Sequence, residues 1–176
     1  PCFSLDRDRL DIIKDSGFTY DSSRIDFGNH SLYGSIEMFD YKKNTASIYQ
    51  RDDFCEFEVS TYPVLSKKMP ISGGGYLRIF PWTLTRELVR QYIKKNDLYV
   101  LYIHPFELSQ LSLRNFPKST SALTKFRFQY GRKKVVRRLK KLVHLLHSYG
   151  YEFTTFRAIQ EELAAKELIK SREDVA

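Results

Sequence analysis

The chain has 176 residues, of which 42% are hydrophobic and 15% aromatic, enough for one globular domain with a sizeable core. No apolar run approaches the roughly 20 residues that a transmembrane helix needs, so no segment of this sequence is expected to span a membrane. The formal net charge is +8, and an excess of Lys and Arg is typical of proteins that bind nucleic acid, anionic glycans or membrane surfaces. Much of the excess lies in residues 132–141, which indicates one cationic face.

The N-terminal part predicts a helix, a short strand and a long irregular segment. Apolar residues stand among charged ones over 6–16, and Gly17 suits the position just past the end of a helix. Residues 18–20 then predict a strand that delivers Asp21 at its carboxyl end. Residues 24–53 are polar and irregular, so we expect them to form a long excursion over the surface.

The middle of the chain alternates between strand and helix signals. Residues 54–59 alternate in character with period two, as a strand with one solvated face does. Three glycines at 73–75 precede a group of aromatic residues and lack the Lys-Ser/Thr ending of a phosphate-binding loop, so a hairpin-like loop is expected. Apolar residues over 83–93 follow the helical period of 3.6. The continuous apolar run 98–103 predicts a strand buried on both faces in a parallel sheet.

The C-terminal part predicts two helices separated by a strand. An apolar stripe begins at Val135 and stops at Gly150, which predicts a long helix whose basic residues within 132–141 form the opposite, solvated face. Residues 151–154 predict a last strand, and residues 156–169 a last helix. Because strands and helices alternate across much of the chain, the sequence favours an α/β fold.

Cysteine usage bears on the redox environment. Cys2 and Cys55 are the two cysteines, and they have neither the spacing of metal ligands nor the density of a disulfide scaffold. We therefore expect both to be reduced and to behave as small apolar residues, which favours a cytoplasmic location.

His104 is the most informative candidate for a functional residue. It stands at the carboxyl end of the predicted strand 98–103, where α/β barrels and open α/β sheets place their active sites, and Pro105 turns the chain there. A histidine in this position is suited to donate a proton to a leaving amine or to stabilise an anionic intermediate. A lone histidine is nevertheless often structural, and position alone leaves both roles open.

Asp21 occupies the corresponding place at the end of the first predicted strand. One interpretation is an Asx-type turn or a helix cap. The other is that Asp21 converges with His104 at the same edge of the sheet, where an aspartate would orient the imidazole of a general acid.

Four segments taken together resemble a known family. They are residues 1–4 (PCFS), 17–23 (GFTYDSS), 73–78 (GGGYLR) and 102–108 (YIHPFEL). In the same order, they resemble the C-terminal half of NodB-homology polysaccharide deacetylases, above all those of bacterial exopolysaccharide loci, which carry an added C-terminal region. The resemblance implies the C-terminal part of a distorted (β/α)₇ barrel. It assigns residues 1–120 to the catalytic domain and residues 121–176 to a helical extension packed on the barrel.

The resemblance also implies roles for individual residues. His104 matches the histidine regarded as the general acid, and Asp21 matches the acidic residue that tunes it, although Ser22 stands where the family often has Trp. Pro1 matches the proline of an Arg-Ala-Pro motif, which implies that the family's earlier motifs precede this chain. Members of the family hold a divalent metal, commonly zinc, with one Asp and two His, and use a second Asp as the base.

The metal ligands are expected to lie outside this sequence. Asp52 and Asp53 form the sole Asp-Asp pair and precede their predicted strand, which is the wrong end for a ligand. His144 and His147 lie three apart on the cationic helix and do not form a His-x-x-x-His pattern. We therefore expect this chain by itself to bind no catalytic zinc and to have no hydrolase activity.

The leading hypothesis is that the complete protein removes N-acetyl groups from hexosamine residues of a polysaccharide or its lipid-linked precursor. Tyr76, Trp82 and Phe106 would line the sugar groove, although core packing explains these aromatic residues equally well. One rival is a basic module in which residues 132–141 bind nucleic acid or an anionic surface, although the resemblance implies a glycan partner rather than nucleic acid. Another is a non-catalytic relative that only binds glycan.

Overall fold

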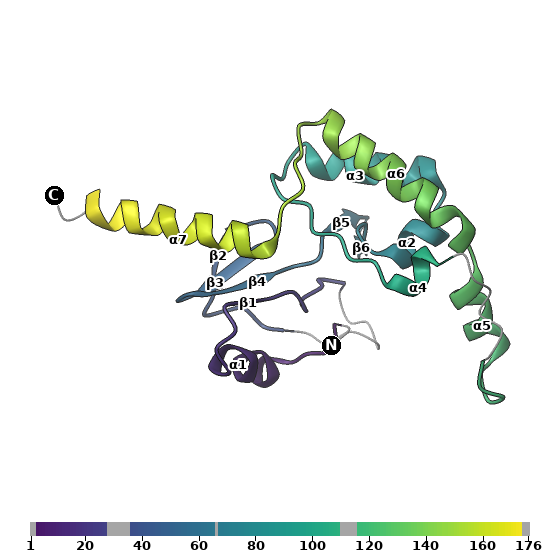
Figure 1. Ribbon diagram of the computed structural model, residues 1–176, viewed down its shortest axis with the longest axis horizontal. Coiled ribbons are helices and arrows are strands. Elements are labelled where there is room, and N and C mark those ends of the chain that lie inside the picture. Colours follow the sequence, from purple (N-terminus) through teal and green to yellow (C-terminus); the bar gives the residue numbers. More distant parts are fainter. Residues whose placement is uncertain (1–2, 28–35, 66, 110–115, 174–176) are drawn as a thin grey trace.

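The structure is a computed structural model that describes residues 3–27, 36–65, 67–109 and 116–173 (Figure 1). Pro1 and Cys2, on which part of the resemblance rests, lie outside these ranges. The described part is mixed α/β, with two small sheets and no closed barrel among these residues. Its helices are α1 (Arg7–Asp15), α2 (Gly74–Ile79), α3 (Trp82–Ile93), α4 (Pro105–Leu108), α5 (Ala122–Gln129), α6 (Arg132–Ser148) and α7 (Phe156–Glu173). Its strands are β1 (Tyr20–Asp21), β2 (Lys42–Thr45), β3 (Ile48–Arg51), β4 (Phe54–Phe57), β5 (Thr61–Val64) and β6 (Lys67–Pro70).

The larger sheet has the strand order β1-β4-β3-β2, and β5 and β6 form a separate hairpin. β1 runs parallel to β4, with Asp21 opposite Glu56, whereas β4, β3 and β2 are antiparallel neighbours. Because β2 and β3 lie within residues 24–53, the prediction of an irregular excursion there is wrong. The strand period was hidden because one of the two buried positions of β3 is Gln50, whose amide bonds to the Asn44 side chain.

β4 is buried along its whole length, contrary to the prediction of one solvated face. Helix α7 lies along one side of the sheet, where Phe156 stacks on Phe57 with ring centroids 4.4 Å apart (Figure 1). Helix α1 covers the other side, where Leu10 belongs to a second apolar cluster. The two carboxylates that suggested a solvated face, Glu56 and Glu58, are therefore buried among protein groups.

Four extended segments lie next to one another beyond the ends of β1 and β4. They are joined by two parallel bridges, Ile25 with Val59 and Gly73 with Tyr102. Residues 98–103, predicted as a buried strand, are extended but form no regular ladder, and among them only Val100 is fully buried. Side-chain hydroxyls replace part of the ladder, because Val100 N donates to Ser60 Oγ at 2.9 Å and Ser72 Oγ donates to Ser60 O at 2.8 Å.

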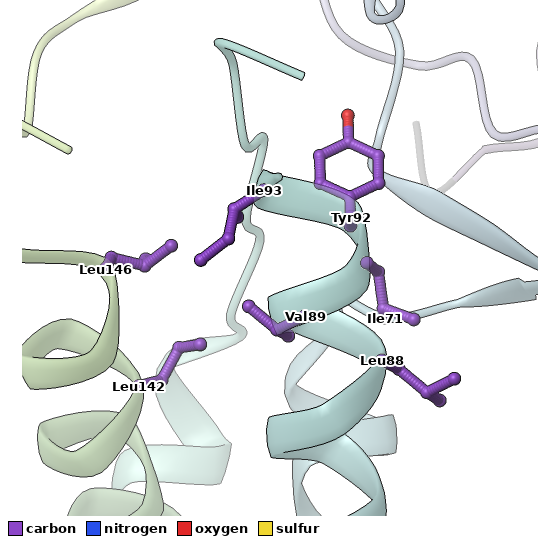
Figure 2. Close-up of a cluster of buried hydrophobic side chains, with 7 residues drawn as sticks. All are labelled: Ile71, Leu88, Val89, Tyr92, Ile93, Leu142 and Leu146. Carbon is purple, nitrogen blue, oxygen red and sulfur yellow. The ribbon is translucent and has the colours of Figure 1, made fainter. Parts of the chain in front are cut away.

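Helices α3 and α6 pack against each other over an apolar core (Figure 2). Its buried members are Ile71, Leu88, Val89, Tyr92, Ile93, Leu142 and Leu146. Both helices confirm the sequence predictions, since their apolar residues recur at helical spacing. The predicted stop of α6 is also confirmed, because Gly150 has φ +81°, a conformation in which a side chain is strained.

Gly74 begins helix α2, so the predicted hairpin-like loop at residues 73–75 is wrong. The glycine is needed because a Cβ at this position would overlap the carboxylate of Glu107. At Gly75, by contrast, the nearest atoms lie 4.0 Å from the position of a Cβ. Glycine here permits the close approach of α2 to the residues of α4.

The residues beyond position 120 pack on the elements that precede them. α6 contacts α2, α3 and α4, and α7 contacts β1. Residues 151–154 form no strand, so that prediction is wrong; Tyr151 packs against the α3–α6 core instead of pairing with a strand. The predicted boundary at residue 120 stays a prediction.

Four charged side chains tie α1 to β3. Arg7 pairs with Asp11 and Asp40, and Arg51 pairs with the same two carboxylates. Tyr41 lies between the guanidinium groups, whose carbon atoms are 5.0 and 5.1 Å from its ring centroid. The hydrogen bond from Arg7 is the largest effect on Asp40, and together with the bond from Arg51 it outweighs desolvation and holds the pKa of Asp40 well below its usual range.

Candidate functional site

His104 lies exposed at the N-cap position of the short helix α4. Its ring stacks on Phe106, with centroids 5.7 Å apart and planes 24° from parallel. The Tyr102 ring meets it edge to face, also at 5.7 Å. Pro105 follows at the first helical position, where its fixed φ is compatible with a helix start. The imidazole is thus held between two aromatic rings while it remains open to solvent.

The backbone of His104 is held by Glu107, whose side chain is 1% exposed. Glu107 Oε2 accepts a hydrogen bond from His104 N at 3.1 Å, and Glu107 N donates to His104 O at 2.9 Å. These reciprocal bonds satisfy backbone groups at the start of α4 that a helix cannot satisfy internally. The turn that carries the imidazole is therefore fixed by a buried carboxylate.

Arg78 compensates the buried charge of Glu107. Its Nε lies 2.9 Å from Glu107 Oε1, although the N–H is not directed at that oxygen. One terminal nitrogen of Arg78 donates to three carbonyl oxygens, those of Arg127, Phe128 and Tyr130. Because both partners are almost completely buried, the pair lies where an unpaired charge would be very costly.

Two further arginines support the same region, which corrects the prediction of a uniformly solvated basic face. Arg138 donates to the carbonyl oxygens of Leu77 and Arg78 near the end of α2, each at 2.8 Å. Arg132, which is buried, donates to the carbonyls of Phe106 at 3.0 Å and Ser109 at 2.9 Å. Both guanidinium groups satisfy carbonyls that short helices leave unpaired at their ends.

Asp21 lies beside Glu56, a residue that the sequence interpretation missed as a site residue. Glu56 is fully buried, and its Oε1 accepts bonds from Ser23 N at 2.8 Å and Arg24 N at 2.7 Å. Its Oε2 and Asp21 Oδ2 are both buried without a hydrogen-bond partner. Burial, followed by the neighbouring charge of Asp21, raises the pKa of Glu56 to about 8. A proton shared between the two carboxyl groups would satisfy both oxygens.

Among the described residues, no contact joins Asp21 to His104. Asp21, which the sequence predicted as the partner of the imidazole, lies instead beside Glu56 on the adjacent parallel strand. Residues 54–59 did carry a signal for this, because Glu56 stands in register with Asp21 if β1 and β4 are paired in parallel. The interpretation of that strand as half solvated concealed the signal.

The three aromatic residues predicted to bind sugar lie in different parts of the structure. Phe106 stacks directly on His104. Tyr76 lies on α2 and packs against Phe27 and Phe80, with ring centroids 6.2 and 5.6 Å away. Trp82 lies elsewhere, at the start of α3, where it packs on the α3–α6 core. Of the three, Phe106 is the residue that the structure brings to His104.

Trp82 lines a groove of about 460 Å³ between α3 and α6. The other lining residues are Arg86, Arg137, Lys140, Lys141, His144, Leu145 and Ser148. The Lys141 ammonium lies 5.7 Å from the centroid of the indole ring. This surface, referred to below as the cationic groove, is formed by two helices whose packing is fixed by the core beneath them.

No group of three or more His, Cys, Asp or Glu side chains within the described ranges is arranged to hold a metal ion. His144 lies in the cationic groove, and His147 packs on Phe153 at a centroid distance of 5.2 Å. Cys55 is a buried free thiol. No helix in the part of the chain that the structure describes has the length and hydropathy required to cross a bilayer.

Comparison with curated proteins gives no match, and neither does comparison with solved structures. Residues 22–160 match the model of a protein family described as Domain of unknown function (DUF3473). The matched stretch contains Glu56, His104 and the cationic groove, and it begins directly after Asp21. Because the match extends over most of the sequence, the chain belongs to the DUF3473 family.

Proposed function

We propose that the complete protein is a metal-dependent carbohydrate N-deacetylase and that this chain supplies the side of its active site that carries His104. The substrate would be an acetamido group on a hexosamine of a polysaccharide or its lipid-linked precursor. Two observations of sequence support this: the four ordered segments resemble polysaccharide deacetylases, and the DUF3473 domain is known from polysaccharide deacetylase-associated proteins.

The geometry of His104 is the observation that carries the proposal. A general acid has to reach its substrate and has to be held in a productive orientation. The imidazole is exposed, it lies between Tyr102 and Phe106, and its backbone is bonded to the buried Glu107. A histidine that merely filled the core would be covered by other side chains.

In amide hydrolysis, these residues would supply a proton and hold the sugar. When the tetrahedral intermediate of amide hydrolysis collapses, the bond between carbon and nitrogen breaks and the leaving amine has to gain a proton. In the proposal, the imidazolium of His104 donates that proton. Phe106, which stacks on the imidazole, would be the aromatic residue against which the pyranose ring packs. The proposal does not use Asp21 as the residue that orients the imidazole, because Asp21 lies beside Glu56; Glu107 and the two flanking aromatic rings hold His104 instead.

The arrangement of the extended segments supports the proposed relation to a barrel. The parallel bridges between Ile25 and Val59 and between Gly73 and Tyr102 bring segments from distant parts of the chain into the same direction. The carboxyl ends of parallel strands meet at one edge, which is where α/β barrels place their catalytic groups. A (β/α)₇ barrel that includes these segments is part of the proposal.

The described residues do not fit a metal site of one Asp and two His. The proposal therefore assigns the metal, expected to be zinc, to residues outside this chain. The contribution of the chain's own residues is limited to holding the substrate and delivering a proton.

Acetate release from an N-acetylglucosamine oligomer by the complete protein tests the proposal. His104→Asn should lower kcat by about 10²- to 10⁴-fold, the usual range for loss of a general acid. His147→Asn is the matched control, because His147 packs on Phe153 at the surface, and it should leave kcat unchanged. Full activity of His104→Asn, or no acetate release by the unmodified protein, would overturn the proposal. Oligomer binding without acetate release would indicate a non-catalytic glycan-binding relative.

A further inference from the structure

The cationic groove collects positive charge from two helices around one aromatic ring. On α6, Arg137 lies three and four residues before Lys140 and Lys141, and His144 lies three and four residues after Lys141 and Lys140, which places the four on one side of the helix. On α3, Trp82 and Arg86 are also four residues apart and face the same hollow. The groove is thus lined by four permanent cations.

Among the described residues, no ion pair joins these cations to a carboxylate. The ion pairs of that part of the chain use other arginines and lysines, and α6 contains no acidic residue. The acidic residue of α3, Glu87, bonds to Arg90 and Gln91. Like charges at helical spacing repel one another, so this clustering does not serve the stability of the fold. A bound anion would relieve the repulsion.

The basic residues of α6 outside the groove fall into two kinds, those that bond to backbone carbonyls and those that are exposed to solvent. Arg132 and Arg138 donate hydrogen bonds to backbone carbonyl oxygens, as described above. Lys133 and Lys134 are exposed on the first turn of α6 and do not line the groove. The concentration of charge at the groove is therefore not simply the consequence of a helix that is basic all round.

We propose that the cationic groove binds the phosphate group of a sugar phosphate. Two guanidinium and two ammonium groups match the double charge and multiple acceptors of a phosphate, and arginine binds such oxygens through paired donors. The half-buried indole of Trp82 provides a face for the ring, and a hollow of about 460 Å³ has the size of a small-molecule site. The choice of a sugar as the ring rests on the proposed deacetylase function, whereas the recognition of phosphate rests on the groove alone.

Trp82 is the one tryptophan of the chain, so intrinsic tryptophan fluorescence reports on this groove alone. Titration with N-acetylglucosamine 1-phosphate should give a saturable change in fluorescence, and uncharged N-acetylglucosamine should give none. Inorganic pyrophosphate should compete with the sugar phosphate. Because this titration requires neither a metal nor acetate release, its result is independent of the test of deacetylation.

Matched charge removals test the site by calorimetry. Lys140→Ala/Lys141→Ala should raise the Kd for N-acetylglucosamine 1-phosphate about tenfold or more, since two charge-assisted contacts are lost. Lys133→Ala/Lys134→Ala removes the same charge from the same helix and should change the Kd less than about twofold, because both lysines lie outside the groove. Far-UV circular dichroism should show that both variants remain folded.

Three results would overturn the proposal. The first is no saturable binding of the sugar phosphate. The second is an equal loss of affinity in both double variants, which would indicate only the general field of a basic helix. The third is a fluorescence change with vesicles of phosphatidylglycerol or with single-stranded DNA but not with the sugar phosphate, which would assign the groove to a membrane surface or to nucleic acid.

Discussion

The carboxylate of Glu107 and the guanidinium of Arg78 form a buried ion pair, with Arg78 Nε 2.9 Å from Glu107 Oε1. Through this pair, Arg78 of α2 contacts Glu107, which also accepts a hydrogen bond from His104 N. The position of the exposed imidazole therefore depends on a buried ion pair. Glycine at position 74 leaves the space that the carboxylate occupies. The candidate site is thereby coupled to the stability of the fold around it.

Glu107→Gln should destabilise the protein by about 3 kcal/mol, because removal of one charge from a buried pair leaves the other uncompensated. The loss should stay at the lower end of the usual range, since Arg78 keeps its three carbonyl acceptors. Urea unfolding at neutral pH measures the change. Glu87→Gln, in an exposed pair with Arg90, is the control and should leave the unfolding midpoint unchanged. Equal effects of the two substitutions would contradict the buried-pair interpretation.

Gly74→Ala should lower the free energy of unfolding by about 1–3 kcal/mol, the usual cost of overpacking. The added methyl would overlap the Glu107 carboxylate and force α2 and α4 apart. Gly75→Ala is the matched control, because a Cβ there meets only atoms at 4.0 Å, and it should be neutral or slightly stabilising through its helix propensity. Thermal unfolding of both variants measures the difference. If Gly75→Ala were the more harmful change, the assigned contact would be wrong.

Elements whose apolar residues follow a local period were predictable from the sequence. Helices α3 and α6 are examples, and the left-handed glycines at positions 17 and 150 marked two helix ends. The strand β4 was recognised, but its burial on both sides was not, because Phe57 is covered by Phe156 at the start of α7, which lies far away in the sequence. Local pattern alone does not reveal which distant element covers a strand.

The candidate site was predictable in position but not in its supporting contacts. The end of an apolar run followed by proline pointed to His104, and Phe106 stands two residues further along the sequence. Arg78 and Glu107 gave no local signal, because their pairing depends on how α2 meets α4. The neighbour of Asp21 was missed for a related reason: a glutamate within an alternating strand ordinarily faces solvent, whereas Glu56 is buried and accepts hydrogen bonds from the backbone of Ser23 and Arg24.

Asp40→Asn should destabilise the protein at neutral pH and do so less in acid. The pKa of Asp40 is lowered in the folded state, so its stabilising contribution is present above the unfolded value of 3.8 and is lost as the pH falls below that value. The difference in free energy of unfolding between wild type and variant should therefore shrink below pH 3.8. Urea unfolding from neutral to acid pH measures it.

Asp53→Asn is the control for this change, because Asp53 is exposed and lies outside the cluster of Arg7, Asp11, Asp40 and Arg51. It should produce a small, pH-independent change. Added salt should weaken the effect of Asp40→Asn, since the four charges are partly exposed. A difference that persists unchanged in acid would exclude an ionic origin.

Glu56→Gln should change the pH dependence of stability in the opposite direction. The folded-state pKa of Glu56 is raised from 4.5 to about 8, so the neutral form is the one that the fold favours. Its contribution is fully present below pH 4.5 and is lost progressively as the pH rises through about 8. Glutamine keeps an oxygen for Ser23 N and Arg24 N and presents an amide donor to Asp21 without titrating. The variant should therefore gain stability relative to wild type as the pH rises over this window.

Urea unfolding at pH values from 4.5 to about 8 measures that gain, with Glu152→Gln as the control because Glu152 is exposed in the connection to α7. The control should follow the wild-type curve. If wild type and Glu56→Gln kept a constant stability difference across this range, the pKa of Glu56 would not be raised in the folded protein.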